Sequence, residues 1–327
     1  MNWSELPASV RDCLNVLTEA GHAAYPVGGC VRDLLLGRTP GDYDVATAAR
    51  PEAVAGLFAH TVPTGLAHGT VTVLLGELSI EVTTFRREGG YADGRHPDAV
   101  DFSAGLTEDL SRRDFTVNAM ALGPDGTIVD PFGGRTDLQN RLIRCVGDPD
   151  RRFGEDALRM LRGIRFAAQL GFELEGETWA AIQRNAAGAG RVSRERIRAE
   201  LEKTLLSDRP EDAGRMIGAG LLDGLYAFPA VCDLSGLKML PNTQYDRWWG
   251  FCAATGFPIA ALPVERRLRR AVEHPEREMI SALALSGGDL RALGLEGPAI
   301  GAAQRRLARH VLEKPEDNTA ERLRELL

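Results

Sequence analysis

The sequence contains 327 residues, more than one ordinary hydrophobic core holds, so we expect two or more domains. Hydrophobic residues make up 44% and charged residues 26%, which is usual for a globular protein and excludes disordered, collagen-like and coiled-coil chains. The formal net charge of −7 argues against a bulk electrostatic attraction to nucleic acid. Positive charge is nearly all arginine, which binds phosphates bidentately, although a coding bias toward arginine explains the excess equally well.

No stretch approaches the roughly 20 uninterrupted apolar residues that a membrane helix needs. The first residues carry neither a basic nor an apolar segment of the kind that forms a signal peptide. Five cysteines are scattered along the chain, and no pair has metal-ligand spacing. We therefore expect a cytoplasmic protein with free thiols and no membrane partner.

The first motif is a glycine turn between two regular elements. Residues 23–27 are predicted to form a strand and residues 30–36 a helix, with Gly28 and Gly29 between them. Glycine lets the backbone approach a ligand closely, and Arg32 in the first helical turn can add a charge-assisted bond to a phosphate. Taken alone, two adjacent glycines more often form a plain tight turn, and this is the alternative.

Carboxylates form the second motif. In residues 41–45, Asp42 and Asp44 are two apart and project from one face if this segment is a strand. A divalent cation relieves their mutual repulsion, and Mg²⁺ uses one or two carboxylates together with substrate phosphates. Glu81 adds a third carboxylate within a run rich in β-branched residues, where it is costly unless paired or metal-bound. The alternative is that Glu81 lies on the solvated face of an edge strand.

Residues 71–75 and 78–84 are predicted to form a hairpin with a turn at Gly76 and Glu77. Residues 86–96 are polar and glycine-rich, so we expect a mobile loop there. After residue 150 the apolar spacing becomes helical, over 153–170 and again over 194–206. The predicted fold is therefore α+β, with an α/β head followed by an all-α C-terminal region.

Five motifs in order make the chain similar to the polymerase-β-like nucleotidyltransferases, and specifically to the bacterial class II tRNA nucleotidyltransferase and poly(A) polymerase family. They are Gly28-Gly29-Cys-Val-Arg32-Asp33, Gly41-Asp42-Tyr-Asp44, the segment 112–120 (RRDFTVNAM), Asp130-Pro-Phe-Gly-Gly134 and Glu155-Asp156-Ala-Leu-Arg159. Residues 192–201 resemble the helix that braces the last of these motifs. The resemblance covers roughly residues 20 to 205.

The resemblance implies roles for particular residues. Asp42 and Asp44 would hold two catalytic Mg²⁺ ions, with Glu81 as a third catalytic carboxylate. The nucleotide would be bound by residues of the glycine turn, the 112–120 segment and the later helix, namely Gly28, Gly29, Arg32, Arg113, Asp114, Asn118, Glu155, Asp156, Arg159, Arg162 and Arg165. The implied domains are a head over 1–150, a helical neck over 151–205 and an all-α body and tail over 206–327 that binds tRNA.

The implied reaction is the addition of C or A from CTP or ATP to the tRNA 3′ end, with release of pyrophosphate. Cytosine and adenine both present an amino donor beside a ring-nitrogen acceptor, whereas uracil and guanine present the reverse. Asp156 and Arg159 together match the first pattern, so no nucleic-acid template is needed. Arg159, Arg162 and Arg165 recur every three residues, and a solvated arginine face on an amphipathic helix is the alternative.

Other functions remain open at this stage. Within the same class the alternatives are CC-only addition, A-only addition and poly(A) synthesis; a loop at 86–96 favours members that add A. A nucleotide- or RNA-binding protein without catalysis is the alternative from another class, although all three carboxylates are present. The arginine-rich segments 266–270 and 305–309 are candidates for holding tRNA phosphates or are solvated helix faces. No protein partner is inferred.

Overall fold

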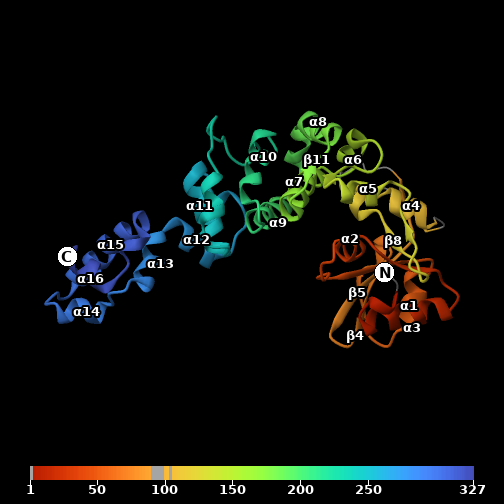
Figure 1. Ribbon diagram of the computed structural model, residues 1–327, viewed down its shortest axis with the longest axis horizontal. Coiled ribbons are helices and arrows are strands. Elements are labelled where there is room, and N and C mark those ends of the chain that lie inside the picture. The colour runs from red at the N-terminus through yellow and green to blue at the C-terminus, as the bar shows by residue number, and fades with distance from the viewer. Residues whose placement is uncertain (1–2, 90–98, 103–104) are drawn as a thin grey trace. The chain divides into compact units, whose positions relative to one another are not determined.

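The structure, a computed structural model, describes residues 3–89, 99–102 and 105–327 (Figure 1). These residues form two compact units: one comprises Met1–Glu200 with Arg215–Gly224, and the other comprises Leu201–Gly214 with Leu225–Leu327. The fold is α+β, as predicted, because a mixed sheet with helices precedes a largely helical region. The first unit holds both the predicted head and most of the predicted neck, so the finer boundaries remain a prediction.

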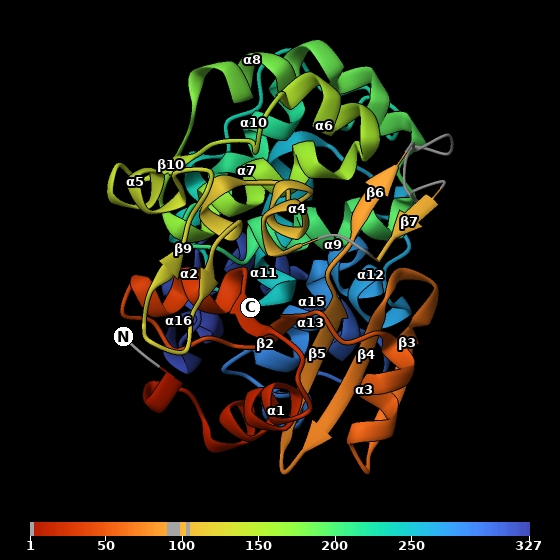
Figure 2. The same cartoon turned by 90° about the vertical axis from the view of Figure 1, so that its right-hand side faces the viewer.

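A seven-stranded sheet organises the first unit, in the order β3-β4-β5-β2-β1-β8-β9 (Figure 2). Its strands are β1 (Ala24–Val27), β2 (Tyr43–Thr47), β3 (Thr61–Gly65), β4 (Thr70–Leu75), β5 (Leu78–Thr84), β8 (Ala121–Leu122) and β9 (Ile128–Val129). Strands β2 and β5 pair in parallel, and the other neighbours are antiparallel. The predicted hairpin is confirmed as β4 and β5.

Helices cover both faces of this sheet. They are α1 (Ala8–Glu19), α2 (Gly29–Leu35), α3 (Pro51–Leu57), α4 (Leu106–Ser111) and α5 (Gly134–Gln139), with 3-10 turns η1 (Trp3–Glu5), η2 (Leu66–His68) and η3 (Thr116–Asn118). On one face, α1 and α3 pack on Val45, Val71 and Ile80 in a large buried cluster. On the other face, Leu110 of α4 packs against Ala46. Because side chains alternate along a strand, Asp44 shares the α4 face with Ala46.

A short ribbon pairs β6 (Arg87–Gly89) with β7 (Ala99–Asp101). The predicted loop over 86–96 is therefore wrong for residues 87–89, which form a strand, and its residues 90–96 lie outside the described residues.

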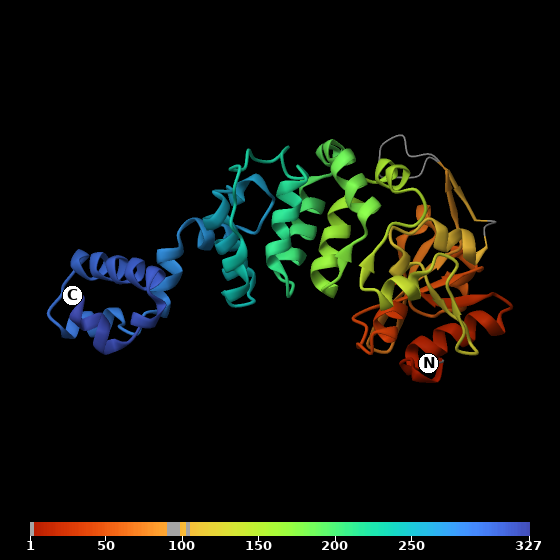
Figure 3. The ribbon, with the colours of Figure 1, turned by 45° about the horizontal axis from the view of Figure 1, so that its top comes forward.

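The helices that follow the sheet in the first unit form its second layer (Figure 3, yellow-green to green). They are α6 (Pro149–Glu155), α7 (Leu158–Leu170), α8 (Gly176–Asn185), η4 (Ala186–Arg191), the first residues of α9 (Arg194–Leu205), and α10 (Ala213–Gly218). The strands β10 (Leu142–Ile143) and β11 (Glu173–Leu174) pair in parallel beside α7. The single helix predicted over 153–170 is wrong, because the chain is extended at Asp156 between α6 and α7.

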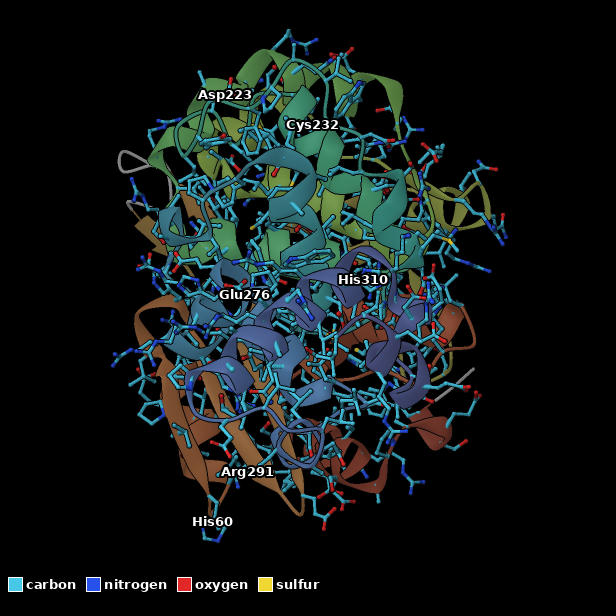
Figure 4. The ribbon with its side chains drawn as sticks, turned by 90° about the vertical axis from the view of Figure 1, so that its left-hand side faces the viewer. His60, Asp223, Cys232, Glu276, Arg291 and His310 are labelled. Carbon is cyan, nitrogen blue, oxygen red and sulfur yellow. The ribbon has the colours of Figure 1, made fainter. Side chains whose placement is uncertain are left out.

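The second unit is helical. Its elements are η5 (Pro210–Asp212), η6 (Ser235–Met239), α11 (Gln244–Thr255), η7 (Ile259–Ala261), α12 (Arg266–Glu273), α13 (Pro275–Ala282), α14 (Gly287–Ala292), α15 (Pro298–Glu313), η8 (Pro315–Asp317) and α16 (Ala320–Glu325). Leucines from α14, α15 and α16, including Leu290, Leu307 and Leu323, form a separate buried cluster. His310 of α15, labelled in Figure 4, forms a hydrogen bond with Asp317 of η8 at 2.5 Å.

No helix in the described part of the chain is long and apolar enough to cross a membrane. All five cysteines are free, as predicted, and Cys13, Cys30 and Cys145 are buried.

Candidate active site

The carboxylates predicted to be catalytic meet where β2 and β5 run side by side. Asp44 of β2 lies directly opposite Glu81 of β5 in the parallel register. Asp42 lies just before β2 and is exposed. The strand expected around residues 41–45 therefore begins at Tyr43, one residue after Asp42. Partners in adjacent strands point to the same face of a sheet, so Asp44 and Glu81 are neighbours. Glu81 is exposed, but the edge-strand alternative is wrong, because β5 lies between β4 and β2 in the sheet.

Asp44 experiences the repulsion that this arrangement implies. Burial, together with the neighbouring charges of Asp42 and Glu81, raises its pKa to about 6 against the lowering effect of Arg113. A carboxylate held in this way gains from a cation that neutralises it. Within residues 3–89, 99–102 and 105–327, no group of three or more His, Cys, Asp or Glu side chains is placed to hold a metal ion. The donor set nevertheless fits Mg²⁺, which takes one or two carboxylates and completes its shell with phosphates and water.

The glycine turn lies directly against these carboxylates. Gly28 has φ +79°, in the left-handed region, and a Cβ there would lie 2.7 Å from Nη1 of Arg113 and 3.7 Å from Oδ2 of Asp44. A Cβ at this position would displace the Arg113 guanidinium, and the left-handed backbone itself favours glycine. Gly29 then begins α2, and Gly28 N–H donates to the carbonyl of Met120 at 3.1 Å. The turn is thus built so that two functional side chains can approach the backbone.

Arg113 lowers the pKa of Asp44 and supplies positive charge at this place. Its guanidinium lies 3.6 Å from the fully buried Asp109 and 3.5 Å from the backbone oxygen of Asn118. Its Nε has no hydrogen-bond partner within the described residues. The side chain therefore keeps donor capacity beside the carboxylates, as a ligand for a triphosphate requires.

A chain of polar contacts connects the glycine turn to α7. Arg32 donates through Nη1 to the side-chain oxygen of Asn118 at 2.7 Å and pairs with Asp33 at 2.8 Å. Asn118 Nδ2 donates in turn to Asp114 at 3.4 Å, and Arg162 donates through Nε to Asp114 at 2.6 Å. The four predicted nucleotide-binding residues of this chain are therefore brought together. In the structure, the Arg32 guanidinium is already hydrogen-bonded to Asn118 and paired with Asp33.

Asp114 stays ionised although it is buried. Burial acts to raise its pKa, but the charge and hydrogen bonds of Arg162, with help from Arg159 and Asn118, lower the pKa to about 2. Its Oδ1 also accepts the backbone N–H of Phe115 at 2.9 Å. Asp114 thus joins the 112–120 segment to α7.

The segment Asp130–Gly134 (DPFGG) packs against η3, which belongs to the 112–120 segment. Asp130 accepts the backbone N–H groups of Gly134 and Arg135 at 2.7 and 2.9 Å and so pairs two N–H groups that the first turn of α5 leaves free. Gly134 packs so closely on η3 that a Cβ would overlap the carbonyl oxygen of Thr116. The Thr116 hydroxyl donates to the buried Asp137 at 2.7 Å. The Asp130–Gly134 motif therefore positions the 112–120 segment.

The predicted base-reading pair lies at the break between α6 and α7. Asp156 is extended, with φ −147° and ψ 107°, and its Oδ1 accepts Leu158 N–H at 3.0 Å, as an N-cap does. Arg196 of α9 pairs with Asp156 at 2.7 Å. Arg159 pairs with Glu155 at 2.9 Å and donates to the carbonyl of Arg112 at 3.2 Å. Both residues are half-buried and held by neighbours.

Glu155 is the common acceptor for several cations. It pairs with Arg152 at 2.6 Å, with Arg159 at 2.9 Å and with Arg151 at 3.2 Å. Arg152 also donates to the carbonyl of Ser111 at 2.6 Å. Glu155 therefore orients Arg159 through its charge, and its own direct contact with a nucleotide remains a prediction.

The predicted arginine stripe does not lie on one surface. Arg165 is only 7% exposed and pairs with the buried Glu200 at 2.7 Å, whereas Arg159 and Arg162 lie nearer the surface. A solvated arginine face is therefore wrong for Arg165. Phe166, which sequence reasoning missed, contacts Arg162 and Arg165 of this stripe and also Arg32 of α2. Its aromatic character next to Arg165 was the one signal available in the sequence.

Both arginine-rich segments of the second unit form helices, as expected. In α12, Arg266, Arg267 and Arg270 are exposed around the buried Leu268. In α15, Arg305 and Arg309 are exposed, and Arg306 donates to the last two backbone carbonyls of the chain.

The sheet, its paired carboxylates and the glycine turn define the class of protein, a nucleotidyltransferase with a poly(A) polymerase head. Residues 24–144 match the family model described as "Poly A polymerase head domain". Residues 171–233 match the model described as "Probable RNA and SrmB- binding site of polymerase A".

Comparison with individual proteins defines the family. The chain is 40% identical over 309 residues to the CCA-adding enzyme of Lactobacillus gasseri, covering 90% of this chain and 78% of that protein. It is 53% identical over 252 residues to the CCA-adding enzyme of Anoxybacillus flavithermus, covering 75% of this chain and 63% of that protein. The crystal structure of the Bacillus stearothermophilus CCA-adding enzyme in complex with CTP superposes with a TM-score of 0.70 at 31% identity, covering 96% and 94% of the two chains. The chain belongs to the family of bacterial CCA-adding enzymes, which are tRNA nucleotidyltransferases.

Proposed function

We propose that this chain adds C, C and A in turn to the 3′ end of tRNA from CTP and ATP. The juxtaposition of Asp44 with Glu81 and Arg113 beside the Gly28 turn is the observation that carries the proposal. The match covers 78% of the L. gasseri relative but 57% of the Limosilactobacillus reuteri relative, so the complete activity is proposed for this chain by analogy.

In the proposed reaction the RNA 3′-hydroxyl oxygen attacks the α-phosphorus of the nucleotide. The bond from that phosphorus to the β-phosphate oxygen breaks, pyrophosphate leaves and the hydroxyl proton is released. Asp42 and Asp44 would hold Mg²⁺, with Glu81 as a further acidic neighbour. Bound Mg²⁺ supplies charge neutralisation for the triphosphate and activation of the attacking hydroxyl.

The arginine side chains hold the nucleotide in this proposal. Arg113, beside Asp44, binds phosphate oxygens, and Arg32 turns toward the triphosphate from its present partners Asp33 and Asn118. Positioning and electrostatic stabilisation of this kind account for most of the catalysis in phosphoryl transfer.

The base is selected by Asp156 and Arg159 in the proposal. The Asp156 carboxylate accepts from the amino group of cytosine or adenine, and Arg159 donates to the adjacent ring nitrogen. Uracil and guanine would leave both groups unpaired, at a cost of roughly 1–3 kcal/mol each. Because Arg196 and Glu155 already hold these two side chains, their directions are largely fixed before the nucleotide arrives.

In this proposal the C-terminal region, residues 206–327, binds the tRNA. The exposed arginines of α12 are suited to phosphate oxygens, whose contacts make binding dependent on salt. The proposed domains are the head over 1–150, the neck over 151–205 and the body and tail over 206–327. The proposed location is the cytoplasm, where tRNA and the nucleotides are found.

The test is incorporation with the purified full chain. Three substrates are compared, namely tRNA lacking CCA, tRNA ending in CC, and an unstructured RNA, each with labelled CTP, ATP, UTP or GTP and with Mg²⁺ or EDTA. We expect three additions on the first, one A on the second, none on the third, and none in EDTA. If tRNA lacking CCA receives only two C residues, the chain is a CC-adding enzyme. If only tRNA ending in CC is extended, by one A, the chain is an A-adding enzyme. Long A tails on unstructured RNA would refute the tRNA assignment.

A further inference from the structure

Phe166 of α7 is surrounded by three guanidinium groups that come from two separate segments. The Cζ atom of Arg165 lies 3.7 Å from the centroid of the Phe166 ring, that of Arg162 lies at 5.2 Å, and that of Arg32 lies at 5.4 Å. The ring is 7% exposed and meets Phe115 edge-on at 5.8 Å between centroids. All three cations are thus within the distance at which an aromatic ring attracts a positive charge.

Each of the three arginines has its own carboxylate, from a different element. Arg32 pairs with Asp33 of α2, Arg162 with Asp114 before η3, and Arg165 with Glu200 of α9. Among the described residues no single carboxylate pairs with all three, and the polar chain through Asn118 and Asp114 joins only Arg32 and Arg162. The Phe166 ring is the group that contacts all three.

Two of these cations belong to opposite ends of the proposed nucleotide site. Arg32 follows the glycine turn, since a Cβ on Gly29 would lie 3.6 Å from its Nη2. Arg162 is one helical turn beyond Arg159 on α7. Like charges repel, and the repulsion is strong in a partly desolvated site. The negative face of a ring that both cations contact offsets part of this repulsion.

We propose that Phe166 is a positioning residue for nucleotide binding, whose ring holds the Arg32 and Arg162 guanidiniums at the separation that the nucleotide requires. The inference rests on the proposed function. Its ring does not touch the reacting atoms. Loss of the ring lets the two cations move apart, so nucleotide binding and base choice weaken while the chemistry of a correctly bound nucleotide is retained.

A leucine at this position separates the proposal from simple filling of the core. Leucine keeps most of the apolar contact but has no ring quadrupole, whereas tyrosine keeps the ring. Phe58 provides the control, because it is 8% exposed, belongs to the same buried cluster and has no cation–π contact with an arginine within the described residues. The variants are therefore F166L, F166Y and F58L, with F166M as a second variant without a ring.

Wild-type incorporation on tRNA ending in CC is measured first, so that failure of the proposed function is recognised separately. KM and kcat for ATP, the ratio of ATP to GTP incorporation, direct ATP binding by calorimetry and thermal unfolding are then compared. We expect F166L and F166M to raise KM and the ATP dissociation constant on the order of tenfold, with kcat within about twofold. F166Y should restore KM, and F58L should lower the unfolding temperature without changing KM.

A double-mutant cycle with R162A tests the connection itself. If the ring acts through the cations, F166L should have much less effect on ATP binding in the R162A background than in the wild type. Equal effects in both backgrounds would overturn the proposal, as would an unchanged KM in F166L and F166M. An F166Y variant that behaves like F166L would also overturn it.

Discussion

Arg196 of α9 donates to both oxygens of the Asp156 carboxylate, through Nη2 to Oδ2 at 2.7 Å and through Nη1 to Oδ1 at 3.3 Å. The two side chains are 40 residues apart in the sequence. A bidentate pair of this kind fixes the plane of the carboxylate as well as its position. The direction in which Asp156 can accept a further hydrogen bond is thus set by α9.

Replacing Arg196 by alanine should therefore impair base selection. Without the guanidinium, Asp156 can rotate, and we expect the preference for ATP over GTP to fall roughly tenfold or more, from the loss of a charged hydrogen bond of about 1.5–3 kcal/mol. Single-nucleotide incorporation on tRNA ending in CC measures this ratio. Glu195→Ala, an exposed position on the same helix, is the control. A ratio unchanged by Arg196→Ala would contradict the orienting role.

Asp44→Asn should abolish incorporation but stabilise the metal-free protein above pH 6. Folding raises the pKa of Asp44 from 3.8 to about 6. Between these two pH values the Asp44 carboxyl is therefore protonated in the folded protein but ionised in the unfolded chain. Stability therefore falls as the pH rises from about 4 to about 6, by roughly 3 kcal/mol in total, and stays lower above that window. Asparagine removes this cost.

Urea unfolding in EDTA at pH 4 and pH 7.5 measures the effect. The difference in unfolding free energy between Asp44→Asn and the wild type should be larger at pH 7.5 than at pH 4 by about 2–3 kcal/mol. Incorporation should fall at least about a hundredfold. A difference that does not depend on pH would show that Asp44 has no raised pKa.

Asp114→Asn should act in the opposite direction. The ion pair with Arg162 helps to lower the pKa of Asp114 from 3.8 to about 2, so its stabilisation is complete above pH 3.8 and is lost as the pH falls toward 2. At pH 7 we expect a loss of roughly 2–3 kcal/mol in the free energy of unfolding. Urea unfolding at pH 7 and pH 2.5 should show this deficit shrinking in acid. The exposed Asp12→Asn variant should show neither the deficit nor its pH dependence.

Gly134→Ala should destabilise the first unit, because the added Cβ would overlap the Thr116 carbonyl and lie 3.0 Å from Cγ of Met120. Overpacking against backbone costs roughly 1–3 kcal/mol or more. Gly154→Ala is the matched control, since nothing lies within 4 Å of a Cβ there and the position is within α6. Alanine in a helix is favoured over glycine, so this variant should gain up to about 1 kcal/mol. Thermal unfolding distinguishes them, and equal behaviour would contradict the packing argument.

The sequence predicted the elements whose signals are local. The β4–β5 hairpin follows from alternating apolar residues around Gly76, and the pairing of Asp44 with Glu81 extends what the spacing suggested. The break at Asp156 could not be read from periodicity, because its side chain competes with the helix for the Leu158 N–H group. Apolar spacing continues on both sides of the break.

Long-range partners account for the remaining differences. A solvated arginine face was the alternative for Arg165, but the side chain is buried and pairs with Glu200, 35 residues later. The contacts of Phe166 join α7 to Arg32, which lies more than a hundred residues earlier in the chain. Contacts between residues so far apart in the sequence are determined by tertiary packing, which no local sequence pattern encodes.

The parallel pairing of β2 with β5 makes the carboxylate site sensitive to strand alignment. Side chains alternate with a period of two, so shifting β5 by one residue along β2 would turn Glu81 toward α1 and place Ile80 or Val82 beside Asp44. Misaligned molecules would then carry a hydrophobic residue at the proposed metal-binding face. Folding errors in these two strands should therefore give inactive molecules, rather than enzymes with graded activity.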